Sequence, residues 1–302
     1  MDLKSGYPFW AVSNGLMHAF PPLRGDRSCD VLVVGGGISG ALIANELCAH
    51  GHDVVLIEQR DIGWGSPAAS TALLQYEIDT HLVDLAKRYG ERDAVLAYRA
   101  CAEAIPALRE VAAGFRGVDC HPMQSLYYAS KRRHRSSLQD EYALRHTHGF
   151  DVRWLDADAV RAEYGISAPG AILSALAARV DPYQLTYRLL MRLAKAGCAV
   201  HDRTVLHTLQ PTARGVTATT PEGLRTRARH VVLATGYAGQ RWLKQKVARN
   251  RSSYAFITDP IDAAALGPLV DTMVWESARP YLYMRSTGGH RLLVGAAGDR
   301  EG

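Results

Sequence analysis

The sequence predicts an α/β fold, α+β overall, in which a domain built on a parallel sheet is interleaved with a domain built on an antiparallel sheet. The chain has 302 residues, 47% of them hydrophobic and 22% charged, which is the composition of a globular protein of one large or two ordinary domains. Near the start, a continuous β-branched run is followed by a glycine-rich turn, a helical pattern and a second β-branched run. Short strand patterns predominate later in the chain.

The first elements form a βαβ unit. Residues 1–28 are rich in aromatic residues and proline, which predicts a strap packed on the body of the protein, too irregular for a helix. Residues 29–34 are typical of a strand buried on both faces, and residues 38–50 of a helix that ends before Gly51. Residues 53–57 predict a second strand, with Glu58 at its carboxyl end. A βαβ unit of this kind is the core of a Rossmann-like domain.

The later elements divide the chain into two discontinuous domains. Helices are expected over residues 80–89, 92–113 and 137–146, and another begins at Asp181-Pro182, with Asp as N-cap and Pro at the first helical position. Strands are expected over residues 125–129, 152–155, 200–206, 216–220, 230–234, 254–258, 273–276, 281–285 and 291–294. We therefore predict a nucleotide-binding domain over residues 29–118 and 176–245, and a substrate or cap domain over residues 119–175 and 246–302.

Charge and cysteine usage narrow the class of protein. The formal net charge is +5, and a basic stretch over residues 224–251 holds eight Lys or Arg residues and no acid; we interpret it as a solvated face and expect no nucleic-acid partner. No stretch reaches the roughly 18 apolar residues of a membrane span, and the start has no signal-peptide pattern. The five cysteines are widely spaced, and the twelve histidines show no metal-ligand spacing. We expect a cytoplasmic protein without a metal site or integral membrane contact, and the sequence leaves the oligomeric state open.

The glycine-rich turn carries the strongest chemical signal. Gly35, Gly37 and Gly40 follow a buried strand directly and open a helix, in the pattern G-x-G-x-x-G. The first glycine allows a tight turn, the second lets a pyrophosphate approach the backbone, and the third lets helix and strand pack closely. The helix N-terminus presents unpaired N–H groups to the phosphates. Glu58 is placed to accept hydrogen bonds from ribose hydroxyls, and a carboxylate there disfavours the 2′-phosphate of NADP.

Other segments of the sequence favour FAD over NAD as the bound dinucleotide. A loop of small residues follows the second strand, Ala234-Thr-Gly236 ends a strand far downstream, and the sequence has no second G-x-G-x-x-G. With residues 30–40, Glu58, the loop 66–74, Val180-Asp-Pro182, Thr204-Val205 and the hairpin 281–295, this pattern resembles the D-amino-acid oxidase and glycine oxidase (DAO) superfamily of FAD-dependent oxidoreductases. The matching segments follow the family's order along nearly the whole chain. The glycine-rich segment and C-terminal helix that follow the hairpin in the family have no counterpart here, so we expect the chain to lack them.

The resemblance implies an FAD site spread over several segments. It assigns the pyrophosphate to Gly35, Gly37, Ser39 and Gly40, with Ile38 beside them, and the adenosine ribose to Glu58, with Gln59 as its neighbour. The ribityl chain and the isoalloxazine ring are expected along Ser66, Ser70, Thr71 and Leu73. The adenine is expected at the Val205 main chain, and the far side of the nucleotide at Thr235 and Gly236.

Substrate contacts are expected in the hairpin over residues 281–295. Strand periodicity places Tyr281, Tyr283 and Arg285 on one face. In proteins that this chain resembles, the antiparallel sheet roofs the flavin, so Tyr283 and Arg285 are the candidate catalytic residues, with the guanidinium meeting a substrate carboxylate. The alternative is an edge hairpin whose polar residues face solvent.

The resemblance also implies an activity. We expect an enzyme that oxidises a small amine or amino acid at its C–N bond by hydride transfer to flavin N5, with the protein orienting the substrate. One alternative is a flavin-dependent dehydrogenase of a hydroxy acid or polyol phosphate. Another is an FAD-binding chain that performs no catalysis.

Overall fold

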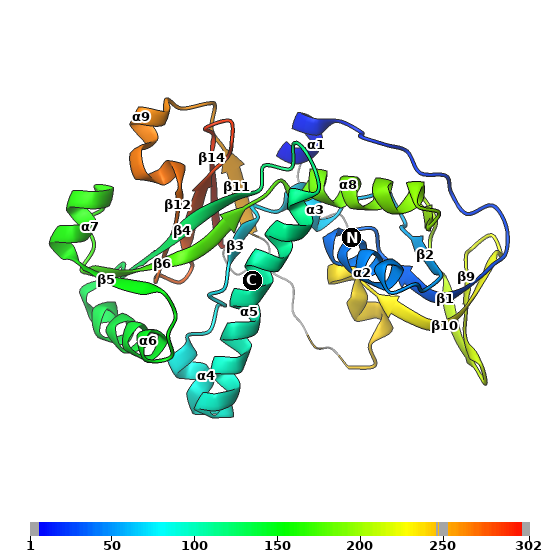
Figure 1. Cartoon of the computed structure of the whole chain (residues 1–302), viewed down its shortest axis with the longest axis horizontal. Coiled ribbons are helices and arrows are strands. Elements are labelled where there is room, and N and C mark those ends of the chain that lie inside the picture. The colour runs from blue at the N-terminus through cyan, green and yellow to red at the C-terminus, as the bar shows by residue number, and fades with distance from the viewer. Residues whose placement is uncertain (1–5, 246, 248–252, 298–302) are drawn as a thin grey trace. The chain divides into compact units, whose positions relative to one another are not determined.

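The chain folds into two compact units (Figure 1). The computed structural model describes residues 6–245, 247 and 253–297. Unit 1 comprises Met1–Ser70 and Asp181–Asn250, and unit 2 comprises Thr71–Val180 and Arg251–Gly302. Both units are discontinuous in sequence, and their bounds differ from those of the sequence-based division. The strap belongs to unit 1, and residues 71–118 belong to unit 2, because their helices pack on its sheet.

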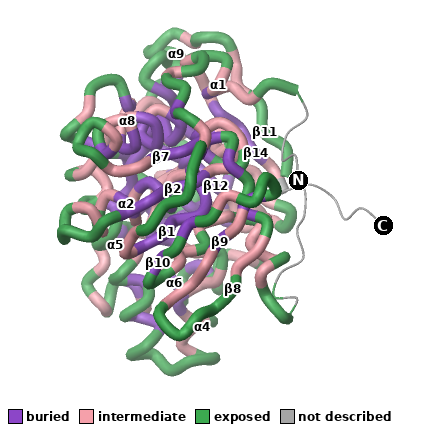
Figure 2. Tube along the Cα trace, turned by 90° about the vertical axis from the view of Figure 1, so that its right-hand side faces the viewer, coloured by how far each residue is buried: buried purple, intermediate pink, exposed green. Residues whose placement is uncertain are grey.

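Unit 1 is built on a six-stranded sheet with the strand order β7-β2-β1-β10-β9-β8. β1 (Arg27–Val34) pairs in parallel with β2 (Val54–Ile57) and β10 (Arg225–Leu233), and β2 pairs in parallel with β7 (Ala199–His201). β9 (Gly215–Thr219) and β8 (Thr208–Thr212) extend the sheet in antiparallel pairing. All four residues of β2 and the last four of β1 are buried, so the parallel strands form the centre of this unit (Figure 2).

The helices of unit 1 include the two that the sequence places most clearly. α2 (Ile38–Ala49) follows β1, and α8 (Pro182–Lys195) lies beside it (Figure 1). The side chain of Asp181 accepts a hydrogen bond of 2.8 Å from the backbone N–H of Gln184, which confirms the predicted N-cap of α8. Two shorter elements are α3 (Ser66–Ala69) and the 3-10 helix η2 (Gly236–Trp242).

The strap packs against unit 1 and contains a short helix that was not expected, α1 (Phe9–Asn14). The Asn14 amide donates to the Asp181 carboxylate at 2.8 Å, so α1 is tied to the start of α8. Further along, the Phe20 and Leu23 backbone N–H groups donate to the side chains of Asp202 and Thr204, both at 3.0 Å. The strap is therefore fixed at both ends by side chains that follow β7 or cap α8.

Unit 2 is built on an eight-stranded sheet with the strand order β11-β14-β13-β12-β4-β6-β3, in which β5 also pairs with β6. Most neighbouring strands are antiparallel, whereas β12 and β4 are parallel. The strands are β3 (Leu73–Gln75), β4 (His121–Tyr128), β5 (Val152–Asp156), β6 (Gly170–Arg179), β11 (Ser253–Ile257), β12 (Thr272–Glu276), β13 (Leu282–Ser286) and β14 (Leu292–Ala297).

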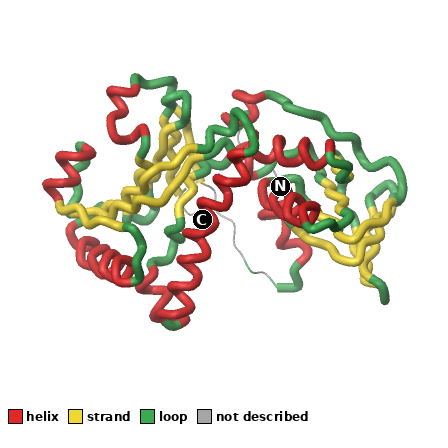
Figure 3. Tube along the Cα trace, viewed as in Figure 1, coloured by secondary structure: helices red, strands yellow, loops and turns green. Residues whose placement is uncertain are grey.

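Helices lie on both faces of this sheet (Figure 3). They are α4 (Leu82–Tyr89), α5 (Glu91–Ala113), the 3-10 helix η1 (Arg132–His134), α6 (Arg135–Thr147), α7 (Ala157–Tyr164), α9 (Ala263–Leu266) and the 3-10 helix η3 (Gly267–Val270). Leu138 of α6 packs with Tyr127 and Trp275 on one face. Val160 of α7 packs with Leu126 and Val274 on the other, so the sheet is covered on both sides.

The combination of a largely parallel sheet and a largely antiparallel sheet confirms the predicted fold class. The structure differs in several elements. The strand expected over residues 200–206 ends at His201, and β6, β8 and α7 were not predicted. Among the described residues, no helix combines the length and the apolar character that crossing a membrane requires.

Candidate functional site

The turn that follows β1 depends on glycine at two positions. Gly35 has φ +116°, and a Cβ there would overlap the carbonyl oxygen of Ala234, at the end of β10. A Cβ at Gly40 would overlap the carbonyl oxygen of Gly35. Only glycine therefore allows β1, β10 and α2 to approach this closely.

Gly37 differs from these two glycines because a Cβ added there would overlap no protein atom. It is the N-cap of α2, with φ −85° and ψ −175°, and the nearest atoms to an added Cβ are side-chain carbons of Pro67 at 3.8 Å. No side chain caps the helix, and its first turn holds no acidic residue. Ile38 is half-buried and Ser39 is exposed. The helix N-terminus is thus open to an anion, which its unpaired N–H groups and its dipole attract.

Glu58 directly follows β2, and its carboxylate lies beside this turn. Its Oε2 accepts a hydrogen bond from the Gly36 backbone N–H at 2.8 Å, and its Oε1 accepts one from the Arg60 backbone N–H at 3.0 Å. Burial raises the pKa of the Glu58 carboxyl, and these two N–H donors oppose that shift. Each oxygen keeps further acceptor capacity, so the group can bind hydroxyls. Gln59, its neighbour, is exposed.

Gly36 is a site residue that the sequence analysis missed. Its N–H holds the Glu58 carboxylate, and a Cβ at Gly36 would overlap the side chain of Ile62. The signal in the sequence was the middle glycine of the run Gly35-Gly-Gly37, which the G-x-G-x-x-G pattern treats as a variable position.

The segment after β7 brings Val205 to the end of β2. The Thr204 backbone N–H donates to the Glu58 carbonyl oxygen at 2.7 Å, although these residues lie outside regular strands. The side chain of Val205 is 37% exposed. The residue before Val205 is therefore paired with the main chain of Glu58, whose carboxylate is the candidate ribose ligand.

The segment after β10 completes the same region. The Ala234 N–H donates to the Val34 carbonyl oxygen at 2.8 Å, which holds this segment beside the glycine turn. The Thr235 hydroxyl is buried and has no hydrogen-bond partner among the described residues. Gly236 follows with φ +53° and is exposed. A buried hydroxyl without a partner indicates a place where a polar ligand group would satisfy it.

The features of unit 1 fit the nucleotide part of FAD. An open helix N-terminus suits a pyrophosphate, a partly buried carboxylate suits ribose hydroxyls, and an unpartnered hydroxyl lies on the segment beside the same turn. The structure thus brings together the predicted residues around Gly37, Glu58, Val205 and Thr235.

The predicted flavin loop is shared between the two units. Ser66 is exposed at the start of α3, and the Ser70 carbonyl accepts a hydrogen bond of 2.8 Å from the indole of Trp10, a strap residue that the sequence analysis did not single out. Thr71 and Leu73 belong to unit 2 and are half-buried.

Arg285 has a structural position in place of the predicted substrate contact. Its side chain is 1% exposed, and its guanidinium donates to the carbonyl oxygens of Thr71 at 2.6 Å, Val180 at 3.0 Å and Ser286 at 2.9 Å. Main-chain carbonyls thus take three of its five N–H donors, whereas the sequence analysis expected a substrate carboxylate there.

Tyr283 lies on the same strand and is half-buried. Its ring packs over Gly295 of β14, where a Cβ would overlap it, and lies 5.5 Å from the ring of Tyr281. The Tyr281 hydroxyl donates to the Asp79 carboxylate at 3.2 Å, and burial raises the pKa of Tyr281 to about 12. The expected substrate contact of Tyr283 stays a prediction.

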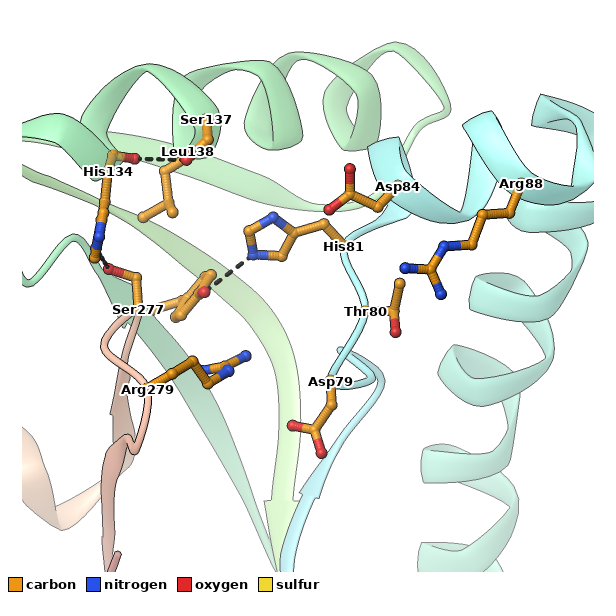
Figure 4. Close-up of a pocket in the computed structure, with 11 residues that line it drawn as sticks. Asp79, Thr80, His81, Asp84, Arg88, His134, Ser137, Leu138, Ser277 and Arg279 are labelled. Carbon is orange, nitrogen blue, oxygen red and sulfur yellow. Dashed lines mark hydrogen bonds between the residues drawn. The ribbon is translucent and has the colours of Figure 1, made fainter. Parts of the chain in front are cut away.

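Unit 2 contains a pocket of about 290 Å³ (Figure 4), and Asp79, the partner of the Tyr281 hydroxyl, is one of its lining residues. His81 lies at its centre and its Nε2 is 3.0 Å from the Tyr127 hydroxyl. Burial lowers the pKa of His81, which favours the uncharged ring. The lining residues are Asp79, Thr80, His81, Asp84, Arg88, Tyr127, His134, Ser137, Leu138, Ser277 and Arg279.

A buried ion network holds the helix that carries part of this lining. Glu141 accepts hydrogen bonds from the Leu82 and Val83 N–H groups, at 2.9 and 3.0 Å, at the first turn of α4. Arg145 donates to Glu141 at 2.7 Å and pairs with Glu77 at 3.4 Å, and all three side chains are inaccessible to solvent. Burial raises the pKa of Glu77. The network fixes the start of α4, and with it His81.

Comparison with known proteins places this arrangement in a family. The model of the DAO family, described as FAD dependent oxidoreductase, matches residues 30–302. The chain is 27% identical to a glycine oxidase of Geobacillus kaustophilus over 277 residues, which cover 88% of this chain and 69% of that protein. It is 24% identical to the gamma-glutamylputrescine oxidoreductase of Escherichia coli over 294 residues, which cover 95% of this chain and 68% of that protein. Across the curated relatives that it matches, the chain spans 38% to 69% of their length.

Solved structures show the same fold. The crystal structure of glycine oxidase from Geobacillus kaustophilus matches with a TM-score of 0.73 at 23% identity, covering 90% of this chain and 71% of that one. That of L-proline dehydrogenase from P. horikoshii matches with a TM-score of 0.75 at 17% identity, covering 91% and 71%. The family match, the relatives and the fold agree with the resemblance seen in the sequence. The chain therefore belongs to the DAO family of FAD-dependent oxidoreductases, with FAD as its cofactor.

Proposed function

We propose that this chain oxidises a small amine or amino acid at its C–N bond, using FAD held by unit 1. The observation that carries the proposal is the open N-terminus of α2 beside the Glu58 carboxylate. The substrate class is supported by two relatives, which are named for glycine and for gamma-glutamylputrescine.

The residues of unit 1 bind and orient the nucleotide in this proposal. The N–H groups around Gly37 and Ser39 hold the pyrophosphate, while Gly35 and Gly40 let the backbone approach it. Glu58 accepts the ribose hydroxyls, with Gln59 and Ile38 as neighbours of these contacts. The main chain at Val205 and the segment Thr235-Gly236 enclose the remaining nucleotide edge.

The flavin side of the proposal rests on fewer contacts. Ser66 and Ser70 in unit 1, and Thr71 and Leu73 in unit 2, are the proposed neighbours of the ribityl chain and ring. Bound FAD supplies the acceptor for the hydride that leaves the substrate carbon. Tyr283 is proposed to orient the substrate by its hydroxyl, and Arg285 supports the sheet on which Tyr283 stands.

Anaerobic flavin reduction tests the proposal. The purified protein is loaded with FAD, freed of unbound cofactor and mixed without oxygen with a panel of amines, amino acids, hydroxy acids and polyol phosphates. We expect amines or amino acids to bleach the visible flavin absorption, and protein-bound FAD to react far faster than free FAD at the same concentration.

Each outcome bears on the proposal. Bleaching by a hydroxy acid or polyol phosphate alone overturns the choice of C–N substrates in favour of the dehydrogenase alternative. A protein that binds FAD with an unchanged spectrum across the whole panel overturns catalysis by this chain. Repeating the assay in air, with measurement of hydrogen peroxide, shows whether dioxygen accepts the electrons.

A further inference from the structure

The strap connects the two chain segments that make up unit 1. Its helix α1 lies beside α3 and the start of α8 (Figure 1). The indole N–H of Trp10 donates to the Ser70 carbonyl oxygen at 2.8 Å, and the Asn14 amide donates to the Asp181 carboxylate at 2.8 Å. Ser70 is the last residue of the first segment of unit 1, and Asp181 is the first residue of the second. Two side chains one helical turn apart on α1 therefore hold both of these chain ends.

Contacts with α8 fix α1 in addition to the indole bond. The Gln184 amide donates to the Asn14 side-chain oxygen at 2.7 Å, and the Tyr183 hydroxyl donates to the Gly15 carbonyl oxygen at 3.1 Å. A helix of six residues is not stable by itself in water, so these contacts and the burial of Trp10 keep α1 folded. The Trp10 indole is thus a hydrogen-bond donor held at a fixed place on unit 1.

The loop that the indole reaches begins at the glycine turn. The Gly63 N–H donates to the Gly36 carbonyl oxygen at 2.9 Å, and side-chain carbons of Pro67, in α3, lie next to Gly37. α3 then ends at its C-cap, Ser70. The loop is therefore attached to the proposed pyrophosphate site at its start and to the strap at its end.

The planarity of the peptide bond extends the effect of the indole by one residue. A trans peptide is planar, so its carbonyl and its N–H point in opposite directions. Ser70 has φ −77° and ψ 141°, so the peptide that follows it turns out of α3. The bond from Trp10 fixes the carbonyl of this peptide and, with it, the direction of the Thr71 N–H. Trp10 therefore sets the orientation of the peptide between Ser70 and Thr71.

We propose that Trp10 is a positioning residue for the flavin, which acts by holding the peptide between Ser70 and Thr71 through its indole N–H. The inference rests on the proposed function, which places Ser70 and Thr71 beside the ribityl chain and the ring. The strap precedes residue 30, where the match to the family model begins, so the family assignment does not supply this role. A loop held by a buried donor has fewer conformations to lose when it binds FAD, and its affinity for FAD is correspondingly higher.

Replacing Trp10 by phenylalanine tests this role, because it removes the N–H donor and keeps a buried ring. We expect Trp10→Phe to bind FAD about 5- to 10-fold more weakly, since the loop loses one hydrogen bond that holds it. Quenching of flavin fluorescence measures the Kd. The visible circular dichroism of the bound flavin reports how the ring is held, and we expect this signal to decrease in Trp10→Phe even when the protein is saturated with FAD.

Two control variants separate the indole bond from general effects on folding. Trp154→Phe makes the same chemical change at a half-buried indole on β5 of unit 2, and it should change the FAD Kd by less than about twofold. Val54→Ala leaves a cavity at the start of β2, at the opposite end of this strand from Glu58. It should lower the midpoint of urea unfolding at least as far as Trp10→Phe does, yet keep the FAD Kd within about twofold and the circular dichroism of the wild type.

The outcomes distinguish this inference from the proposed function. If Trp10→Phe keeps the FAD Kd and the circular dichroism of the wild type, Trp10 does not position the flavin. The same conclusion follows if Val54→Ala reproduces the changes of Trp10→Phe, because lost stability then explains them. If Trp10→Phe does not fold, benzothienylalanine at position 10, which keeps the shape of Trp and has sulfur in place of the N–H, tests the same bond. Neither measurement needs a substrate, so a wild-type flavin that no amine reduces overturns the proposed C–N oxidation, while the two binding measurements still decide the role of Trp10.

Discussion

Replacing Gly37 by alanine is expected to weaken the binding of FAD to unit 1 without changing the stability of its fold. The backbone at Gly37 is extended, at φ −85° and ψ −175°, so alanine adopts it without strain. Its Cβ would meet only Pro67 carbons at 3.8 Å, an ordinary van der Waals distance. Alanine is a poorer N-cap than glycine, but it loses less entropy on folding, and the two effects are each about 0.5–1 kcal/mol. We therefore expect the apo protein to keep its stability within about 1 kcal/mol.

In the proposed FAD site, the same methyl group would occupy the space through which the pyrophosphate reaches the N–H groups of α2. Forcing a methyl group into an occupied site costs about 1–3 kcal/mol, so FAD binding should weaken roughly 5- to 150-fold. Urea unfolding of the apo protein and FAD titration followed by quenching of flavin fluorescence measure the two quantities. Gly25→Ala is the matched control, because Gly25 is an exposed glycine of the same unit with no atom within 4 Å of an added Cβ.

Two results would refute the reasoning. If Gly37→Ala binds FAD as tightly as wild type and Gly25→Ala do, the pyrophosphate does not lie at the N-terminus of α2. If Gly37→Ala unfolds as readily as Gly40→Ala, in which the new Cβ overlaps the Gly35 carbonyl oxygen, the open space seen beside Gly37 is not there.

Three further changes test other parts of the structure. Glu58→Gln should weaken FAD binding about 10- to 100-fold, since it removes a charged acceptor, whereas the control Glu46→Gln on α2 should leave FAD binding unchanged. Fluorescence titration measures both affinities, and equal affinities of the two variants would contradict the assignment of Glu58 to the ribose. In wild type, the pKa of Glu58 is raised, so its carboxylate becomes protonated at a higher pH than that of an exposed glutamate. The FAD Kd, measured over a pH series, should therefore rise on acidification before exposed carboxylates become protonated. Arg285→Met should cost about 3 kcal/mol or more in urea unfolding, because three carbonyl oxygens lose their donor, and a near-neutral result excludes this bracing role. Ala72→Gly should be neutral to stabilising by about 1 kcal/mol in the same assay, since Ala72 has φ +49°, and a marked loss of stability means that its methyl group is needed for packing.

The sequence predicts those parts of the fold whose signals are local. The β1–α2–β2 unit and the N-cap of α8 follow from residues that are adjacent in the chain. β6 was missed because its residues are covered on both faces and rich in alanine, so it shows neither alternation nor a strong strand propensity. The strand after α8 was predicted too long because Thr204, Val205 and Leu206 resume a β-branched and apolar pattern after the ladder with β2 has ended at His201.

The residues of the candidate site likewise divide into those whose sequence signal is local and those placed by contacts between distant segments. The glycine turn and Glu58 could be assigned because their spacing encodes their geometry. The position of Arg285 could not, since strand periodicity gives its face but not the carbonyls of Thr71 and Val180, which come from distant segments. The pocket of unit 2 was equally inaccessible to the sequence analysis, because its charges meet only when α4, α6 and the segment after β12 pack on one sheet.

The carbonyls that Arg285 binds belong to Thr71 and Val180, the residues at which the chain enters unit 2 and first leaves it. One guanidinium spans both, so Ser70 and Asp181 also lie within a short reach of each other. For unit 1, residues 71–180 are therefore an insertion whose two ends lie close together, and the length of such an insertion can change at a small cost in loop-closure entropy. Unit 1 can thus keep the register of β1, β2 and β10 when the length of this segment changes.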